Sequence, residues 1–346
     1  MRYRILGRSG LRVSELCLGT MTFGETWGWG APPAECRAML DVFVENGGNF
    51  LDTASNYTGG SSEEILGELL DGRRDELVVA TKYTLSSRPG DPNAGGNHRK
   101  NLVQTVEQSL RRLRTDRVDL LWMHLWDSTT PVDEVLRAMD DLVRAGKVLH
   151  VGMSDSPAWV VARACAVAEL RGWTRPTAVQ APYSISSRDV ERELLPMAAV
   201  HDLPLLAWAV IGGGVLTGKY SGGDGDTASR RYGELRPRER TQRIVAEVQA
   251  VGRECGMTPA QVALAWMRAP QRRRQVIPLL GARNAAQLRD NLRVLDVDLP
   301  PDAVRRLDAA GEIQLGYPRS VLEDDEMLSL TWGTTLPRVD LPAARA

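Results

Sequence analysis

The sequence contains Asn49-Phe-Leu-Asp52, Leu77-Val-Val-Ala-Thr-Lys82 and Asp119-Leu-Leu-Trp-Met-His124, three strand-like apolar runs that each end on a polar residue. The carboxyl ends of successive parallel strands meet at one mouth of an α/β barrel. A carboxylate, an ammonium and an imidazole would therefore face the same opening, and Tyr57 follows closely enough to reach it. These groups together predict a site for proton transfer from an activated tyrosine.

Apolar runs of strand length recur along the chain, and helix-like stretches separate them. The segment Pro131–Ala145 shows the helical pattern best, because its apolar residues repeat at the i, i+3, i+4 spacing of one buried face. Eight strands that are each followed by a helix predict a (β/α)8 TIM barrel, and we expect residues 1–346 to form one domain. The eight runs are Ser14–Gly19, Asn49–Asp52, Leu77–Lys82, Asp119–His124, His150–Ser154, Thr177–Gln180, Pro204–Trp208 and Gln275–Pro278.

A doubly wound open sheet is the main alternative to the barrel. That fold usually binds a dinucleotide through a GxGxxG motif after its first strand, and the segment Gly19–Gly24 lacks this spacing. The barrel is therefore favoured. Ahead of it, Tyr3–Leu6 and Leu11–Val13 predict a β-hairpin that closes the barrel floor. The glycine-rich stretch around Ser221–Ser229 indicates a mobile loop within the barrel rather than a linker between domains.

Composition and charge exclude several classes of function. The chain has 346 residues, of which 43% are apolar, and 43 Lys and Arg nearly balance 44 Asp and Glu, so no global charge attracts nucleic acid or an anionic membrane. The four cysteines are far apart and the four histidines have no metal-ligand spacing, so we expect neither disulfides nor a metal. No apolar run approaches the ~20 residues of a membrane span. The expected location is the cytoplasm, and the sequence is compatible with a monomer or a homo-oligomer.

Several motifs, in their order and spacing, resemble those of the aldo-keto reductases along essentially the whole chain. The segment Gly281-Ala-Arg283 looks most like that of the bacterial members related to the potassium-channel β subunit. The resemblance implies a barrel oxidoreductase that transfers hydride between a nicotinamide cofactor and a carbonyl compound. The matching segments are Leu18–Gly24, Phe50–Tyr57, Ser62–Gly67, Val79–Lys82, Val118–His124, Gly146–Ser154, Gln180–Tyr183 and Val215–Lys219.

The four polar residues suit this chemistry, and the resemblance assigns them the same roles. Hydride delivery to a carbonyl leaves an alkoxide that needs a proton, and Tyr57 is the expected general acid. Free tyrosine has a pKa of about 10. A neighbouring Lys82 ammonium lowers that pKa, and Asp52 keeps Lys82 charged and oriented. His124 is expected to donate a hydrogen bond to the substrate oxygen.

The resemblance also places one half of the cofactor. Ser154, Asp155 and Gln180 match residues that hold the nicotinamide amide, and Asp155 stands where the family has Asn. Trp208 matches the aromatic residue that stacks on the nicotinamide ring, although Ala209-Val210 replaces the Ser-Pro that usually follows it. Further cofactor contacts are expected from Gly19, Thr20, Met21 and Asp52.

The other half of the cofactor is expected at the loop after the seventh strand and at the last helix. Leu216, Gly218 and Lys219 match the pyrophosphate loop, where small residues and backbone N–H groups approach phosphate closely. Gly281 and Arg283 precede a helix, and Arg283 can grip a 2′-phosphate. On that helix, Gln287 and Asn291 are expected to meet the adenine. NADPH is therefore the expected cofactor, and use of NADH stays open because the usual Lys-Ser pair is replaced by Gly281-Ala282.

Aromatic residues in the loops above the barrel predict the substrate pocket. We expect Tyr57 and His124 to bind a small-molecule carbonyl substrate together with three aromatic side chains, Phe23, Trp27 and Trp126. The C-terminal tail, residues 312–346, is expected to lie over the active site, and its Trp332 could reach the pocket. Asn97 is expected to cap the helix after the third strand.

Three functions are compatible with these patterns. The first is a carbonyl reductase that uses NAD(P)H. The second is a cofactor-binding regulatory subunit, like the channel β subunits, in which slow turnover serves as a redox sensor. The third is a barrel isomerase or lyase that uses Asp52 and Lys82 without a nicotinamide. Arg283, Gln287 and Trp208 at cofactor positions argue against the third.

Overall fold

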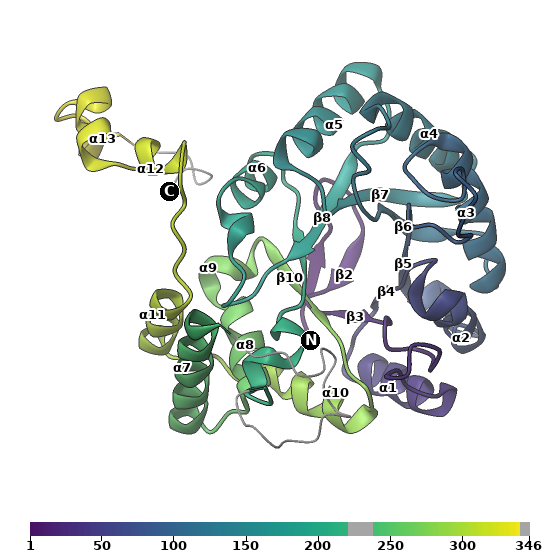
Figure 1. The fold of residues 1–346 in the computed structure, drawn as a ribbon, viewed down its shortest axis with the longest axis horizontal. Helices are drawn as coiled ribbons and strands as arrows, with labels where there is room; N and C mark the ends of the chain where they lie inside the picture. Colours follow the sequence, from purple (N-terminus) through teal and green to yellow (C-terminus); the bar gives the residue numbers. More distant parts are fainter. Residues whose placement is uncertain (221–237, 340–346) are drawn as a thin grey trace.

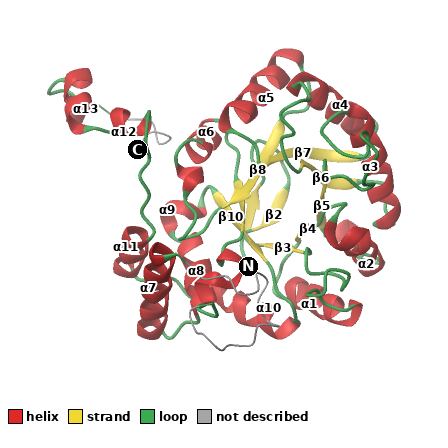
Figure 2. Cartoon of the chain, in the orientation of Figure 1, coloured by secondary structure: helices red, strands yellow, loops and turns green. Residues whose placement is uncertain are grey.

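The computed structural model describes residues 1–220 and 238–339, and its central feature is a closed barrel of eight parallel strands (Figures 1 and 2). The strands follow one another around the barrel in sequence order, and β10 closes it by pairing with both β9 and β3. All eight predicted runs are confirmed as strands. Their bounds are β3 (Cys17–Gly19), β4 (Phe50–Asp52), β5 (Val78–Tyr83), β6 (Val118–Met123), β7 (Val148–Ser154), β8 (Pro176–Pro182), β9 (Leu205–Trp208) and β10 (Val276–Leu280).

Helices surround this barrel because each carries one apolar face (Figure 2). In α4 (Val132–Arg144) the predicted apolar positions are buried, including Val135, Leu136 and Met139. The helix therefore packs against the barrel through its apolar stripe and exposes its polar face. The remaining helices are α1 (Pro33–Glu45), α2 (Ser61–Leu69), α3 (Arg99–Arg112), α5 (Ala158–Arg171), α6 (Leu194–Val200), α7 (Glu239–Cys255), α8 (Pro259–Met267), α9 (Pro270–Arg273), α10 (Ala285–Leu292) and α11 (Pro301–Ala310).

The predicted N-terminal hairpin consists of β1 (Tyr3–Ile5) and β2 (Arg12–Ser14), which pair antiparallel. Leu6 and Val13 are fully buried in a cluster with barrel-interior residues such as Phe50 and Trp122. Apolar side chains thus fill the interior and leave no channel among the described residues. The hairpin packs at the amino ends of the strands, so the carboxyl ends remain available for a site.

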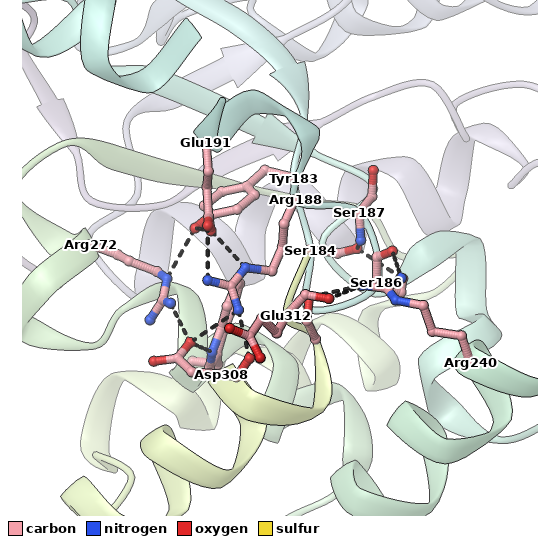
Figure 3. Close-up of polar contacts among 12 residues, drawn as sticks. Tyr183, Ser184, Ser186, Ser187, Arg188, Glu191, Arg240, Arg272, Asp308 and Glu312 are labelled. Carbon is pink, nitrogen blue, oxygen red and sulfur yellow. Dashed lines mark hydrogen bonds and ion pairs between the residues drawn. The ribbon is translucent and has the colours of Figure 1, made fainter. Parts of the chain in front are cut away.

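A polar network joins the segment after β8 to the C-terminal helices (Figure 3). The Tyr183 hydroxyl donates to Glu191 at 2.5 Å and accepts from Arg272 Nε at 3.1 Å. The Arg272 guanidinium also pairs with Asp308 of α11 and stacks over the Trp266 ring, 3.8 Å from its centroid. Arg188 completes the network by binding both oxygens of Glu191 and the Asp308 backbone carbonyl. We refer to these six residues as the Tyr183–Asp308 network.

The C-terminal tail differs from its predicted position. Past Gln314, α12 (Arg319–Leu322) and α13 (Asp325–Trp332) lie away from the barrel (Figure 1). Tyr317 is 87% exposed and Leu330 is 73% exposed, so these two apolar side chains of the tail do not pack on the barrel. The tail therefore does not cover the active site in this structure. The glycine-rich stretch around Ser221–Ser229 lies outside the described residues.

Candidate active site

Three of the four expected catalytic groups meet through one ammonium group at the carboxyl mouth of the barrel. Asp52 ends β4 and Lys82 lies near the end of β5, where both side chains are almost completely buried. Lys82 Nζ forms an ion pair with Asp52. It also donates to the Thr53 carbonyl at 2.8 Å and to the hydroxyl of Tyr57 at 3.0 Å. The Tyr57 hydroxyl is therefore held at the end of the Asp52–Lys82 ion pair.

Burial changes the electrostatics that the sequence led us to expect. Burial alone would lower the pKa of Lys82, but Asp52 and Tyr57 outweigh it and raise that pKa above its ordinary value. Lys82 is therefore charged. Burial raises the pKa of Tyr57, and the opposing effect of Lys82 does not cancel it. The predicted effect of Lys82 on the pKa of Tyr57 is present, but burial outweighs it, because the extent of burial cannot be read from the position of Tyr57 in the sequence.

His124 follows β6 and lies edge-on to Tyr57, with ring centroids 6.0 Å apart and planes at 81°. Burial, together with the charge of Lys82, lowers the pKa of His124 to about 3. The imidazole is therefore neutral near pH 7. Its buried Nδ1 has no hydrogen-bond partner among the described residues, so the ring keeps bonding capacity for a ligand.

The expected cap of α3 has a different role. His98 caps that helix, whereas Asn97 is completely buried and links the β5–α3 and β6–α4 loops at the barrel mouth. Its Nδ2 donates to Thr84 Oγ1 and to the Leu125 carbonyl, both at 2.9 Å, and its Oδ1 accepts from the Asp127 backbone at 2.7 Å. Because Thr84 Oγ1 accepts in turn from the His124 backbone at 3.3 Å, Asn97 holds the loop that carries His124.

A cavity of about 810 Å³ opens above Asp52, Tyr57, Lys82 and His124, which we call the tetrad. It runs from Tyr57 to α10. Trp27 and Trp29 line it beside the phenol, and Trp27 lies edge-on to Tyr57 with centroids 6.3 Å apart. Most residues expected to contact cofactor line this cavity. They are Gly19, Met21, Asp52, Ser154, Asp155, Gln180, Trp208, Lys219, Gly281, Arg283, Gln287 and Asn291.

Five expected contact residues do not line the cavity. Phe23 is completely buried in the hydrophobic core, and Trp126 packs against Met123 and Val132 behind the barrel wall. An aromatic side chain near the mouth can turn inward as readily as upward, and the sequence does not distinguish the two. Thr20, Leu216 and Gly218 are also absent from the cavity wall. Thr20 is hydrogen-bonded to the Asp52 carbonyl, Leu216 is buried, and Gly218 packs against Gln249 of α7.

The structure adds residues of α8 to the cavity wall, among them Thr258, Pro259 and Leu264. Thr258 and Gln261 form a capping box that begins this helix. The Thr-x-x-Gln spacing was readable from the sequence as a helix start. Its position beside the cavity was not readable, because it depends on how the helix packs.

The end of the cavity near Tyr57 suits a nicotinamide. Ser154 Oγ is buried and has no partner among the described residues. Gln180 donates its Nε2 to Asp52 at 3.1 Å, which directs its amide toward the tetrad. Trp208 lines the cavity and donates its Nε1 to Asp155 at 3.2 Å. A buried hydroxyl without a partner, an oriented amide and a fixed indole fit an amide-bearing aromatic ring.

The opposite end of the cavity suits an anionic group. Asn284 caps α10 by accepting from the Gln287 backbone at 2.9 Å, and the Arg283 backbone donates to Gln287 Oε1 at 2.9 Å. Gly281 adjoins open space, so a ligand can approach the backbone there. The Arg283 side chain has no ion pair within the described part of the chain. A helix N-terminus beside an uncompensated guanidinium favours phosphate.

Two features bear on other classes of protein. Within residues 1–220 and 238–339, no helix is long and apolar enough to cross a membrane. The same residues contain no group of three or more His, Cys, Asp or Glu side chains that could hold a metal ion.

Comparison with known proteins agrees with this geometry. Residues 15–312 match the model of the aldo/keto reductase family. The chain is 41% identical to norsolorinic acid reductase of Emericella nidulans over 91% of this chain and 82% of that protein. It is 36% identical to an aryl-alcohol dehydrogenase of Pestalotiopsis microspora over 93% and 85%, and 34% identical to the NADP(+) aryl-alcohol dehydrogenase of Phanerodontia chrysosporium over 91% and 87%. The protein belongs to the aldo/keto reductase family.

Proposed function

We propose that this oxidoreductase uses NADPH to reduce an aromatic aldehyde or ketone to its alcohol, with Tyr57 as the proton donor. The observation that carries the proposal is the buried Asp52–Lys82–Tyr57 chain, which opens into a cavity that also reaches Arg283. One end of the cavity holds an acid and the other suits a phosphate. This arrangement suits a reaction in which a proton is transferred to the substrate beside a bound dinucleotide that carries a phosphate.

The residues on the cavity wall divide between the two parts of that cofactor. Ser154 and Gln180 would hold the nicotinamide amide, Trp208 would support the ring, and Arg283 would bind the 2′-phosphate. NADPH, when bound, supplies the hydride. One of the relatives carries NADP(+) in its name, which supports the same preference. Lys219 lines the cavity between the two ends and would meet the pyrophosphate.

The raised pKa of Tyr57 suits its role as an acid. A phenol with a raised pKa stays protonated near pH 7 and so carries the proton that the reaction needs. An alkoxide is a stronger base than a phenolate, so the proton moves toward the new alcohol oxygen. Lys82, 3.0 Å from the phenol oxygen, then stabilises the phenolate that remains. Neutral His124 can donate a hydrogen bond to the same substrate oxygen without adding charge.

The aromatic substrate class is inferred from the mouth of the cavity. Trp27 and Trp29 pack with ring centroids 5.4 Å apart, and both line the space beside Tyr57. Such rings favour a flat apolar partner over a hydrated polyol. Two relatives are named as aryl-alcohol dehydrogenases, which supports an aryl carbonyl compound as substrate.

Two measurements test the proposal. NADPH should quench the tryptophan fluorescence of the protein, and the bound cofactor should be oxidised at a higher kcat/KM with a benzaldehyde than with an aliphatic aldehyde of similar size. Binding without measurable multiple turnover on any carbonyl would favour the regulatory alternative. Failure to bind NADPH or NADH would contradict the proposal.

A further inference from the structure

Three carboxylates line the described cavity wall, and they differ in their partners. Asp52 is neutralised by Lys82. Asp290 accepts from Thr258 Oγ1 at 3.3 Å and from Gln261 Nε2 at 3.0 Å. Asp155 accepts a hydrogen bond from the indole of Trp208 at 3.2 Å and forms no ion pair within the described residues. It is therefore the uncompensated negative charge nearest to the tetrad.

The backbone at Asp155 does not require a carboxylate. Its φ is 39°, a left-handed conformation that Asn adopts as readily as Asp. An Asn side chain would also accept the Trp208 hydrogen bond at the same oxygen. Burial raises the pKa of Asp155, so its ionised form is held at a cost in free energy. The feature that Asp adds over Asn is its charge.

The charge of Lys82 lowers the pKa of Asp155 and so partly offsets burial, but no cation among the described residues forms an ion pair with this carboxylate. The Asp52–Lys82 pair is neutral as a unit, and His124 is uncharged near pH 7 because its pKa lies at about 3. Trp208 fixes the carboxylate beside the surface that supports the nicotinamide ring. A neighbouring carboxylate attracts a cationic ring more strongly than a neutral one.

We propose that Asp155 biases the site toward the oxidised, cationic nicotinamide and thereby favours hydride donation to the carbonyl. This inference rests on the proposed function. The reduced ring is neutral and the oxidised ring carries one positive charge. During reduction the hydride, with its electron pair, goes to the carbonyl carbon and the Tyr57 proton goes to the oxygen. Asp155 touches neither atom but stabilises the charge that the ring gains.

The test compares the dissociation constants of NADP+ and NADPH, each followed by quenching of tryptophan fluorescence near pH ~8, well above the ordinary carboxyl range. In Asp155→Asn the ratio of the NADP+ constant to the NADPH constant should rise by about tenfold. Asp155→Gly, which tolerates the same φ, should shift the ratio in the same direction. Asp290→Asn is the matched control, because it removes an equal charge from the opposite end of the cavity and should leave the ratio unchanged.

The outcomes separate this inference from the proposed function. If Asp155→Asn leaves the ratio unchanged, the charge of Asp155 does not distinguish the two forms and the inference is overturned. The inference would also be contradicted if Asp290→Asn shifted the ratio of the two dissociation constants. Loss of any negative charge on the cavity wall would then be enough to change the ratio. Wild-type protein that binds neither form would overturn the proposed function itself.

Discussion

Two groups of buried polar side chains lie beside the same barrel and use their hydrogen-bonding capacity differently. In the Tyr183–Asp308 network, each polar side chain contacts at least two others (Figure 3), and Arg272 Nη1 is its one buried polar atom without a partner among the described residues. Around the cavity, Ser154 Oγ and His124 Nδ1 are buried without a partner in the described part of the chain. A buried polar group without a partner costs about 1–3 kcal/mol. The first group contributes to stability, and the second is arranged for a ligand at some expense of stability.

The two groups also differ in what their arginines contact. Arg272 stacks on Trp266 and binds Tyr183 and Asp308, so its guanidinium is enclosed by its own chain. Arg283 lies at the cavity wall, where its backbone N–H donates to Gln287 at the start of α10 and its side chain forms no ion pair among the described residues. The same residue type thus serves folding in one region and, as we propose, ligand binding in the other. Matched substitutions of these arginines test the distinction.

The largest effect on stability is expected from Arg272→Met. This change removes one partner of Asp308 and the stacking of the guanidinium on Trp266, while an unbranched apolar side chain is kept. We expect the free energy of unfolding to fall by about 2–4 kcal/mol, measured by urea denaturation. The dissociation constant of NADPH for the folded protein should change less than twofold. A large loss of cofactor affinity with unchanged stability would contradict the distinction.

The matched change Arg283→Met should do the reverse. Loss of a charge-assisted contact to the 2′-phosphate should weaken NADPH binding by about 1.5–3 kcal/mol. NADH lacks that phosphate, so its affinity should barely change, and the urea midpoint should stay where it is. Equal losses for both cofactors would make Arg283 a structural residue instead.

Much of this contrast could be predicted from the sequence, but not all of it. The strands were readable because each is a short apolar run, and Asp52, Lys82 and His124 stand out as polar residues at strand ends. Spacing alone does not show how deeply a side chain is buried. The raised pKa of Tyr57 therefore could not be read from the sequence, and Phe23 was placed in the pocket although it belongs to the core.

The Tyr183–Asp308 network was not predictable for a related reason. Its members come from three separate segments, after β8, around α8 and α9, and in α11. The local sequence of each segment does not indicate which distant residues its side chains will contact. The tail was misplaced because its position was inferred from the family resemblance, whereas apolar side chains in its described part, such as Tyr317 and Leu330, are exposed.

Acid tests whether His124 is held neutral in the folded protein. The folded-state pKa of His124, about 3, lies below its ordinary value of 6.5, so between these values the unfolded chain binds a proton that the folded chain does not. Stability should therefore fall as the pH drops from about 6.5 toward 3, by up to about 1.4 kcal/mol per pH unit from this residue. His124→Gln should show a shallower loss of urea stability over the same range. Parallel profiles for the two proteins would show that His124 is not held neutral.

The proton-donor role of Tyr57 is tested most directly by Tyr57→Phe. The ring remains beside His124 and Trp27, and only the hydroxyl bound to Lys82 is lost. Single-turnover oxidation of bound NADPH by a benzaldehyde should slow by at least about 10²–10⁴-fold, the usual contribution of general acid catalysis, while the NADPH dissociation constant changes less than about twofold. A variant that binds NADPH normally and keeps most of its single-turnover rate would contradict the account.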